Sequence, residues 1–142
     1  MEFRPTHFTQ SAGLVCWYDT RTYYYFRVTY DETAGIVLGI VLADDATYKE
    51  LASSQVAVGH WPRYYLRAQI DGAALQFSAS PDAAQWTNIG PGLDASKISD
   101  DYGTVLHFTG AMIGLCAQDL GGTHEVFADF DYFELAETSP KP

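Results

Sequence analysis

The sequence has few positive charges and no long apolar run. Lys and Arg together number 8 against 18 Asp and Glu in 142 residues, so the formal net charge is −10. Binding to the phosphate backbone of a nucleic acid, or to an anionic membrane surface, requires a cationic surface that this composition does not supply. No apolar stretch reaches the roughly 18 residues that a membrane-spanning helix needs. We therefore expect neither a nucleic-acid partner nor a membrane partner.

Cysteine and histidine are sparse as well. Cys16 and Cys116 lie far apart, which permits one disulfide but favours packed free thiols, and neither has metal-ligand spacing. No two histidines have the i, i+4 spacing of a helical zinc site; they are His7, His60, His107 and His124. The N-terminus has no signal-peptide pattern. Together these features predict a cytoplasmic rather than a secreted location, with no resident metal.

Calcium is the one cofactor that the acidic turns leave open. The sequence has no D-x-D-x-D-G loop, which is the spacing that a calcium loop of the EF-hand type requires. We therefore assign no residue to a calcium site and predict no other cofactor.

Alternating side chains predict β-strands along most of the chain. In residues 22–31, Tyr24, Phe26 and Val28 share one face, which is the period of a strand. Similar alternation marks residues 63–71 and 75–79, joined by an Asp-Gly hairpin signal. Residues 36–42 are apolar on both faces, which predicts a central strand.

The remaining segments are less regular. We predict a short strand over residues 86–89, an irregular stretch over 90–103 with one helical turn near 94–98, and strands within 105–118 and 125–135. Hydrophobic residues make up 47% of the chain, which is enough for a packed core. Short strands with frequent turn signals predict one all-β domain over residues 1–136, an antiparallel β-sandwich, with a polar tail at 137–142.

Aromatic residues make up 15% of the sequence and admit two interpretations. Their rings could stack on sugars, or they could fill a core or a domain interface. Because the rings alternate over both faces of their strands, core or interface is favoured over a ligand platform. The candidates for either role are Trp17, Tyr18, Tyr23, Tyr25 and Trp61, with Trp86 in the same pool.

Glycoside hydrolysis by the chain itself would need two carboxyl groups about 5–10 Å apart across the scissile bond. Three pairs are close in sequence. Two of them consist of adjacent residues at turns, which favours solvated carboxylates, and the third shares a strand face but has no recognisable acid pocket. We therefore predict no catalytic residue among Asp44, Asp45, Asp100, Asp101, Asp129 and Asp131.

Three segments carry a family resemblance. They are HFTQSAGL at 7–14 with the aromatic strand at 17–29, FTGAMIGLCAQD at 108–119, and ADFDYF at 128–133. Together they resemble the C-terminal concanavalin A-like β-sandwich, a jelly roll, of glycoside hydrolase family 43 β-xylosidases and α-L-arabinofuranosidases. The resemblance runs from about residue 2 to residue 134.

The resemblance implies an accessory role. In such enzymes the catalytic carboxylates belong to an N-terminal five-bladed propeller, and the sandwich packs on it and closes its pocket, where xylo-oligosaccharides are cleaved. A loop of the sandwich commonly presents an aromatic side chain to the substrate. In this sequence that place falls on His107, beside Phe108, so these two residues are the candidates for a pocket wall.

The resemblance also implies that residues 2–5 follow earlier strands, so that this chain lacks the first strands of the sandwich. Missing strands would leave sheet edges and apolar surface uncovered, which predicts self-association. The alternative function is an independent, lectin-like module that binds carbohydrate.

Overall fold

The computed structural model describes residues 1–137, and its larger layer is an antiparallel sheet of five strands. In spatial order these are β5 (Thr47–Ala57), β4 (Gly35–Asp44), β3 (Tyr23–Asp31), β2 (Gln10–Trp17) and β9 (Met112–Asp119). The strands β2 to β5 follow one another along the chain, whereas β9 returns from far along the sequence to pair with β2. The interior strand β4, next to the edge strand β5, is buried on both faces for most of its length, as its apolar sequence predicted.

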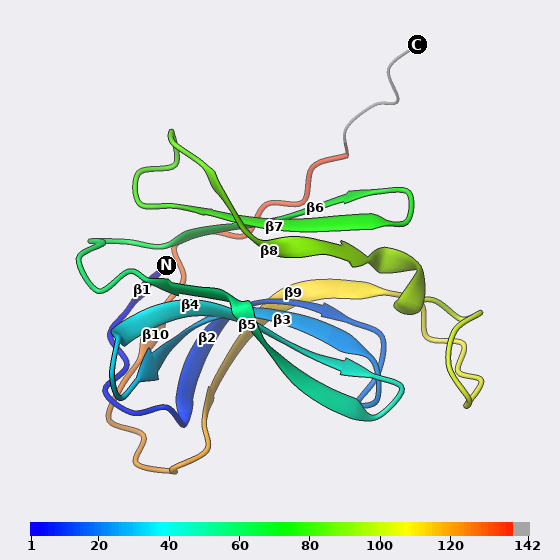
Figure 1. Ribbon diagram of the computed structural model, residues 1–142, viewed down its shortest axis with the longest axis horizontal. Helices are drawn as coiled ribbons and strands as arrows, with labels where there is room; N and C mark the ends of the chain where they lie inside the picture. Colours follow the sequence, from blue (N-terminus) through cyan, green and yellow to red (C-terminus); the bar gives the residue numbers. More distant parts are fainter. Residues whose placement is uncertain (138–142) are drawn as a thin grey trace.

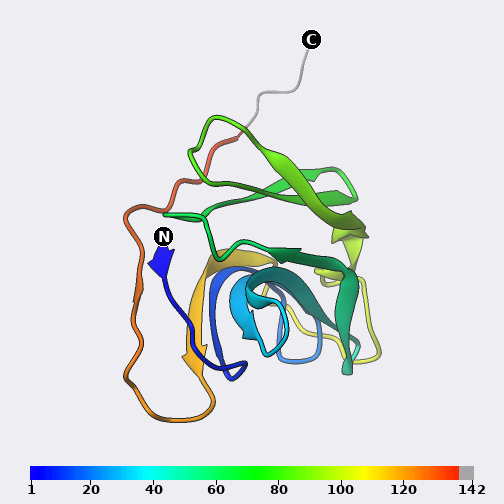
Figure 2. The same ribbon diagram turned by 60° about the vertical axis from the view of Figure 1, so that its left-hand side comes forward.

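A smaller antiparallel sheet lies over the larger one (Figures 1 and 2). It consists of β6 (Tyr65–Asp71), β7 (Ala74–Ser80) and β8 (Thr87–Asp94), and a single 3-10 turn, η1 (Ala95–Lys97), follows β8. A two-stranded pair, β1 (Glu2–Phe3) with β10 (Ala128–Asp129), lies beside the two layers. The predicted antiparallel β-sandwich is therefore confirmed. Within residues 1–137, no helix has the length and apolar character that crossing a bilayer requires.

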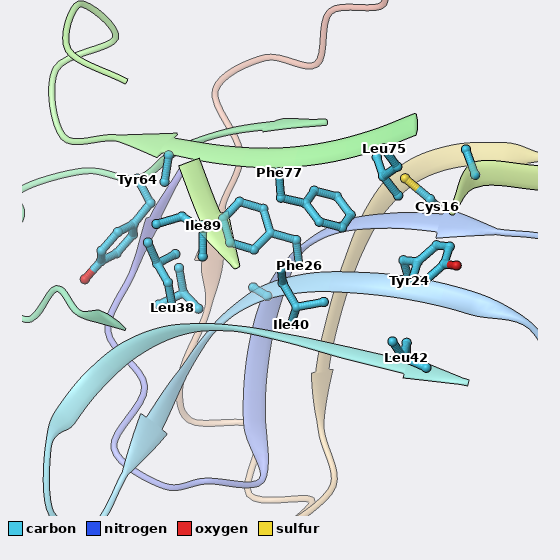
Figure 3. Close-up of a cluster of buried hydrophobic side chains, with 14 of the residues drawn as sticks. Cys16, Tyr24, Phe26, Leu38, Ile40, Leu42, Tyr64, Leu75, Phe77 and Ile89 are labelled. Atoms are coloured by element: carbon cyan, nitrogen blue, oxygen red, sulfur yellow. The ribbon is translucent and has the colours of Figure 1, made fainter. Parts of the chain in front are cut away.

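The core lies between the two sheets. The ring of Phe26 on β3 meets the ring of Phe77 on β7 at a centroid distance of 5.0 Å, and both side chains are fully buried (Figure 3). Tyr64 and Ile89 extend this cluster toward one end, and Cys16 extends it toward the other. Each buried apolar side chain of this size contributes about 1.5–3 kcal/mol, so the contact between the layers is the main source of stability.

The sequence did not reveal strand β5. Its side chains are mostly exposed because it forms one edge of the larger sheet, so it lacks a clear apolar alternation. A bulge between Leu38 and Ile40 accommodates it. There the buried hydroxyl of Ser54 accepts a hydrogen bond from the amide of Ile40 at 2.8 Å and donates one to the carbonyl of Leu51 at 2.6 Å.

Strand limits in the second half of the chain also differ from the predictions. Strand β8 runs past residue 89 to Asp94, through Gly90 at φ +68°. The strand expected over 105–118 begins only at Met112, and the last one is limited to Ala128–Asp129. Ser78 and Ser80, which alternate with the apolar side chains of β7, are buried as well, so both faces of the second half of β7 are covered. Of the expected polar tail, residues 138–142 lie outside the described residues.

Gly13 allows β2 and β3 to approach each other closely. A Cβ atom on residue 13 would lie 2.0 Å from the backbone oxygen of Phe26, so one of the two strands would have to move. By contrast, a Cβ atom on Gly39 of β4 would have no atom within 4 Å.

We therefore predict that Gly13→Ala lowers the free energy of unfolding by about 3 kcal/mol or more, because a methyl group is forced against the backbone of the neighbouring strand. Gly39→Ala is the matched control and should change it by less than about 1 kcal/mol. Urea denaturation followed by tryptophan fluorescence measures both. Equal effects of the two substitutions would contradict the close approach at Gly13.

Candidate functional site

The segment between η1 and β9 forms a loop at one end of the sandwich (Figure 1). We call residues 100–110 the tip loop. Val105, Leu106 and Phe108 are 45%, 73% and 86% exposed, so three large apolar side chains face solvent within four residues. Gly103 and Gly110 lie on either side of them, both with positive φ, where the chain reverses.

Asp100 joins the two ends of this loop. Its Oδ1 accepts a hydrogen bond from the hydroxyl of Tyr18 at 2.8 Å and one from the amide of Gly110 at 3.4 Å. The Tyr18 hydroxyl also contacts the carbonyl of His107, and Thr109 donates its side-chain hydroxyl to the carbonyl of Tyr18 at 3.3 Å. Burial, together with the Asp100 carboxylate, raises the pKa of Tyr18. The loop is therefore tied to the end of β2 at both of its ends.

His107 turns back toward the sandwich rather than outward. Its Nε2 lies 3.3 Å from Oδ2 of Asp19, and its ring lies edge-on to Tyr18 at a centroid distance of 6.3 Å. Asp19 is itself fixed, because its Oδ1 accepts the amides of Arg21 and Thr22 at 2.8 Å each. The two sequence candidates therefore differ: His107 is half-buried and held, whereas Phe108 is free.

The hairpin between β4 and β5 supports the start of the tip loop. Oδ1 of Asp45 accepts a hydrogen bond from Nη2 of Arg21 at 2.9 Å and another from the hydroxyl of Thr104 at 3.1 Å. Beside it, the carboxylate of Asp44 accepts hydrogen bonds from Nζ of Lys97 at 2.6 Å and from the hydroxyl of Tyr102 at 2.5 Å. The hydrogen bond from Lys97 holds the pKa of Asp44 below the ordinary value, and the one from Arg21 does the same for Asp45. In return, the carboxylate of Asp44 raises the pKa of Lys97.

Three of the six acidic residues considered above are thus structural rather than freely solvated. Asp44, Asp45 and Asp100 do lie at turns, as predicted, but each is hydrogen-bonded to another element, which the sequence did not reveal. Asp129 and Asp131 are exposed, and only the first belongs to a strand.

Three of the candidate aromatic residues meet on one face of the larger sheet, the face turned away from β6–β8. Trp17 and Tyr23 stack at a centroid distance of 5.3 Å and an interplanar angle of 17°. Beside them Tyr25 is buried, with its hydroxyl 3.3 Å from Oγ of Ser11 and 3.2 Å from the carbonyl of Cys116. The stacked rings cover each other, so this face offers less free aromatic surface than the sequence suggested.

The other aromatic candidates lie elsewhere. Tyr18 is in the core and joins the tip loop, as described above. Trp61 lies between β5 and β6, 6.4 Å from the ring of Tyr64. The ring of Trp86 is covered by the guanidinium of Arg67 at 3.5 Å. The structure therefore does not bring the whole set together.

The two thiols lie on opposite faces of the larger sheet. Cys16 aligns with Ile113 on the inner face, and Cys116 aligns with Gly13 on the outer face. Both are free, and burial raises the pKa of the Cys16 thiol to about 12. Within the described part of the chain, no group of three or more His, Cys, Asp or Glu side chains is placed to hold a metal ion.

A groove of about 880 Å³ opens beside the free edge of β6. The larger sheet has two more strands than the smaller one and is therefore about 10 Å wider. As a result β9 extends beyond β6, and part of its inner face, at Leu115, is uncovered, whereas Ile113 on the same face packs against the core. The groove is lined by Leu66 and Ala68 of β6, Leu14 of β2, and Leu115 of β9, which is 40% exposed.

Comparison with known proteins places this geometry in context. A family model described as the beta xylosidase C-terminal concanavalin A-like domain matches residues 1–136. A putative β-xylosidase of Escherichia coli is 37% identical over 136 residues, covering 94% of this chain and 25% of the relative. The β-xylosidase of Bacillus subtilis is 34% identical over 140 residues, covering 96% and 26%.

Solved structures agree with the sequence matches. A xylan β-1,4-xylosidase from Bacillus halodurans superimposes with a TM-score of 0.83 at 32% identity, over 88% of this chain and 24% of that protein. The chain thus spans about a quarter of the length of the relatives that it matches.

The ion pair of Asp44 with Lys97 allows a prediction about pH. Asp44 has a lowered pKa in the folded state, so it stabilises the fold above about pH 4, and this contribution is lost as the pH falls through its folded pKa. Lys97 has a raised pKa, so its contribution is complete below about pH 10.5 and is lost only above it.

We predict that Asp44→Asn lowers the free energy of unfolding by about 1 kcal/mol at pH 7. Near pH 3 the variant and the wild type should differ less in this free energy, because Asp44 of the wild type is then becoming protonated. Thermal unfolding across this pH range measures the effect. Asp101→Asn, at an exposed position two residues before Gly103, is the control for removal of one charge. A constant difference between wild type and Asp44→Asn from pH 7 to pH 3 would contradict the role of the ion pair.

Proposed function

The chain belongs to the family of C-terminal concanavalin A-like domains of β-xylosidases, and from this premise we propose that it is a non-catalytic accessory domain of a family 43 glycoside hydrolase. Its relatives are about four times as long, and this domain follows their catalytic domain. The hydrogen-bonded state of the acidic turn residues supports the same assignment, because it leaves them without a glycosidase acid–base pair.

We propose that the domain packs on a five-bladed catalytic propeller and closes its pocket with the tip loop. The observation that carries this proposal is the apolar tip itself: Leu106 and Phe108 are exposed although the loop around them is tightly hydrogen-bonded. Exposed apolar groups on a fixed support are typical of a contact surface. The mechanism would be steric. A tip that narrows the pocket to one or two sugars favours exo cleavage of short xylo-oligosaccharides.

Within the tip, Phe108 is the better candidate than His107 for a wall that contacts sugar. The C–H face of a pyranose packs on an aromatic ring, and Phe108 offers such a ring, whereas His107 is turned toward Asp19. The carbohydrate-binding alternative has weaker support, because Trp17 and Tyr23 cover each other's faces. Saturable binding of xylobiose to the chain alone, measured by calorimetry, would favour that alternative.

The pocket-closing proposal predicts a kinetic effect of Phe108. In a chimera in which this chain replaces the matched quarter of the Bacillus subtilis β-xylosidase, Phe108→Ala should lower kcat/KM for xylobiose about tenfold. Loss of one large apolar contact is worth about 1–3 kcal/mol in a site of this kind. Leu120→Ala is the control, because Leu120 is equally apolar and exposed but follows the opposite end of β9. Equal rates for the two variants would contradict the proposal.

We also propose that the chain by itself self-associates through the groove. Leu115 and the neighbouring apolar side chains of the groove are uncovered, and β6 and β9 each end a sheet. A second copy that packs there would bury this surface. The expectation that earlier strands of the sandwich precede this chain stays a prediction.

Light scattering at micromolar concentration tests the self-association. We predict species larger than a monomer, and Leu115→Lys should shift them toward the monomer because it places a charge in the groove. Met112→Lys is the matched control: it lies on the same strand, is 51% exposed, and aligns with Trp17 on the other face. A wild-type chain that is wholly monomeric, or equal effects of both lysines, would contradict this proposal.

A further inference from the structure

We infer that Tyr18 and Asp100 are positioning residues that hold the tip loop in one conformation, so that Leu106 and Phe108 are presented to the partner without prior ordering. This inference rests on the function proposed above, and it assigns a role to two residues that do not themselves belong to the contact surface.

The first support is the way the loop is closed. Residues 100–110 have almost no regular secondary structure, yet the carboxylate of Asp100 reaches the amide of Gly110 at the other end. Such a segment, whose ends meet, is an Ω-loop. Its closure depends on a single side chain, because the same Oδ1 atom accepts both the Gly110 amide and the Tyr18 hydroxyl.

The second support is the position of Tyr18 between the core and the loop. Its ring belongs to the buried core cluster, whereas its hydroxyl lies between the Asp100 carboxylate and the His107 carbonyl. The ring therefore fixes the hydroxyl relative to the sandwich, and the hydroxyl fixes the two sides of the loop relative to each other. A phenylalanine at this position would keep the core contact and lose only the link to the loop.

The third support is which atoms of the loop are left free. Polar side-chain atoms of Thr104, His107 and Thr109 are held by residues outside the tip loop, and the amide of Gly110 is held by Asp100 at the other end of the loop. The side chains of Val105, Leu106 and Phe108, in contrast, point into solvent. Ordering a loop on binding costs conformational entropy, so a loop that is already ordered binds more tightly for the same contacts.

If Tyr18 served only the core, removing its hydroxyl should affect the tip loop no more than removing the hydroxyl of another buried tyrosine. Tyr64 provides this comparison. It is equally buried, and its hydroxyl accepts one hydrogen bond, from Arg4 at 2.9 Å, in a contact that involves no tip-loop residue. Tyr64→Phe therefore matches Tyr18→Phe in chemistry and burial and differs in what the hydroxyl holds.

The first experiment uses the chain alone. Amide hydrogen exchange of residues 104–110 should become faster in Tyr18→Phe and Asp100→Asn, by about tenfold at Gly110, because the hydrogen bond that Asp100 accepts from the Gly110 amide is weakened or lost. In Tyr64→Phe, exchange in this segment should stay at the wild-type rate. Two results would overturn the inference: unchanged exchange of this segment in Tyr18→Phe, or an equal acceleration of this segment in Tyr18→Phe and Tyr64→Phe.

The second experiment is a double-mutant cycle in the chimera with the Bacillus subtilis enzyme. If Tyr18 acts through the tip, Tyr18→Phe should lower kcat/KM for xylobiose in the wild-type chain but have no further effect in the Phe108→Ala background. Additive losses would overturn the positioning role. If Phe108→Ala itself has no effect, the pocket-closing function fails, while the exchange experiment still decides whether Tyr18 and Asp100 fix the loop.

Discussion

Aspartate carboxylates that accept backbone amides close the turns on which the rest of this structure depends. The carboxylate of Asp31 accepts hydrogen bonds from the backbone amides two and three residues further along the chain, and that of Asp82 does the same at the turn before β8. Asp19 repeats the arrangement between β2 and β3, and Asp94 begins η1 in a related way. A carboxylate that accepts such bonds satisfies amides that no strand pairs, and it fixes the direction in which the next strand leaves.

This mode of turn closure explains how so acidic a chain folds. A net charge of −10 opposes compaction, but many of the acidic groups lie at turns, where backbone N–H groups and a few cations compensate them. Hydrogen bonds from backbone amides hold the pKa of Asp31 and Asp82 below the ordinary value, so both carboxyls stay ionised well into the acidic range. The same carboxylates therefore serve local structure first, and that use leaves them unsuited to proton transfer.

The parts of the fold that sequence could predict are those in which one face of a strand is buried. Strands β3, β6 and β7 follow their apolar alternation closely, and β4, which is buried on both faces, follows its continuous apolar run. Strand β5 escaped prediction because an edge strand with two exposed faces has no such alternation, and Ser54 is its one fully buried side chain. For the candidate site, sequence singled out His107 and Phe108. It could not show that Tyr18 joins Asp100, because these residues lie 82 positions apart and meet only through the folded sheet.

Exposed apolar side chains are unevenly distributed along this domain. The first hundred residues form nearly the whole core, and few of their large apolar side chains are exposed. After residue 104 the pattern reverses: the tip, the uncovered face of β9 and the last described segment together carry most of the exposed large hydrophobic residues. In the tip loop, the apolar side chains that face solvent lie on a backbone that Tyr18 and Asp100 hold in place. Because a free domain gains nothing from keeping such groups fixed and exposed, their arrangement is best understood as one half of an interface.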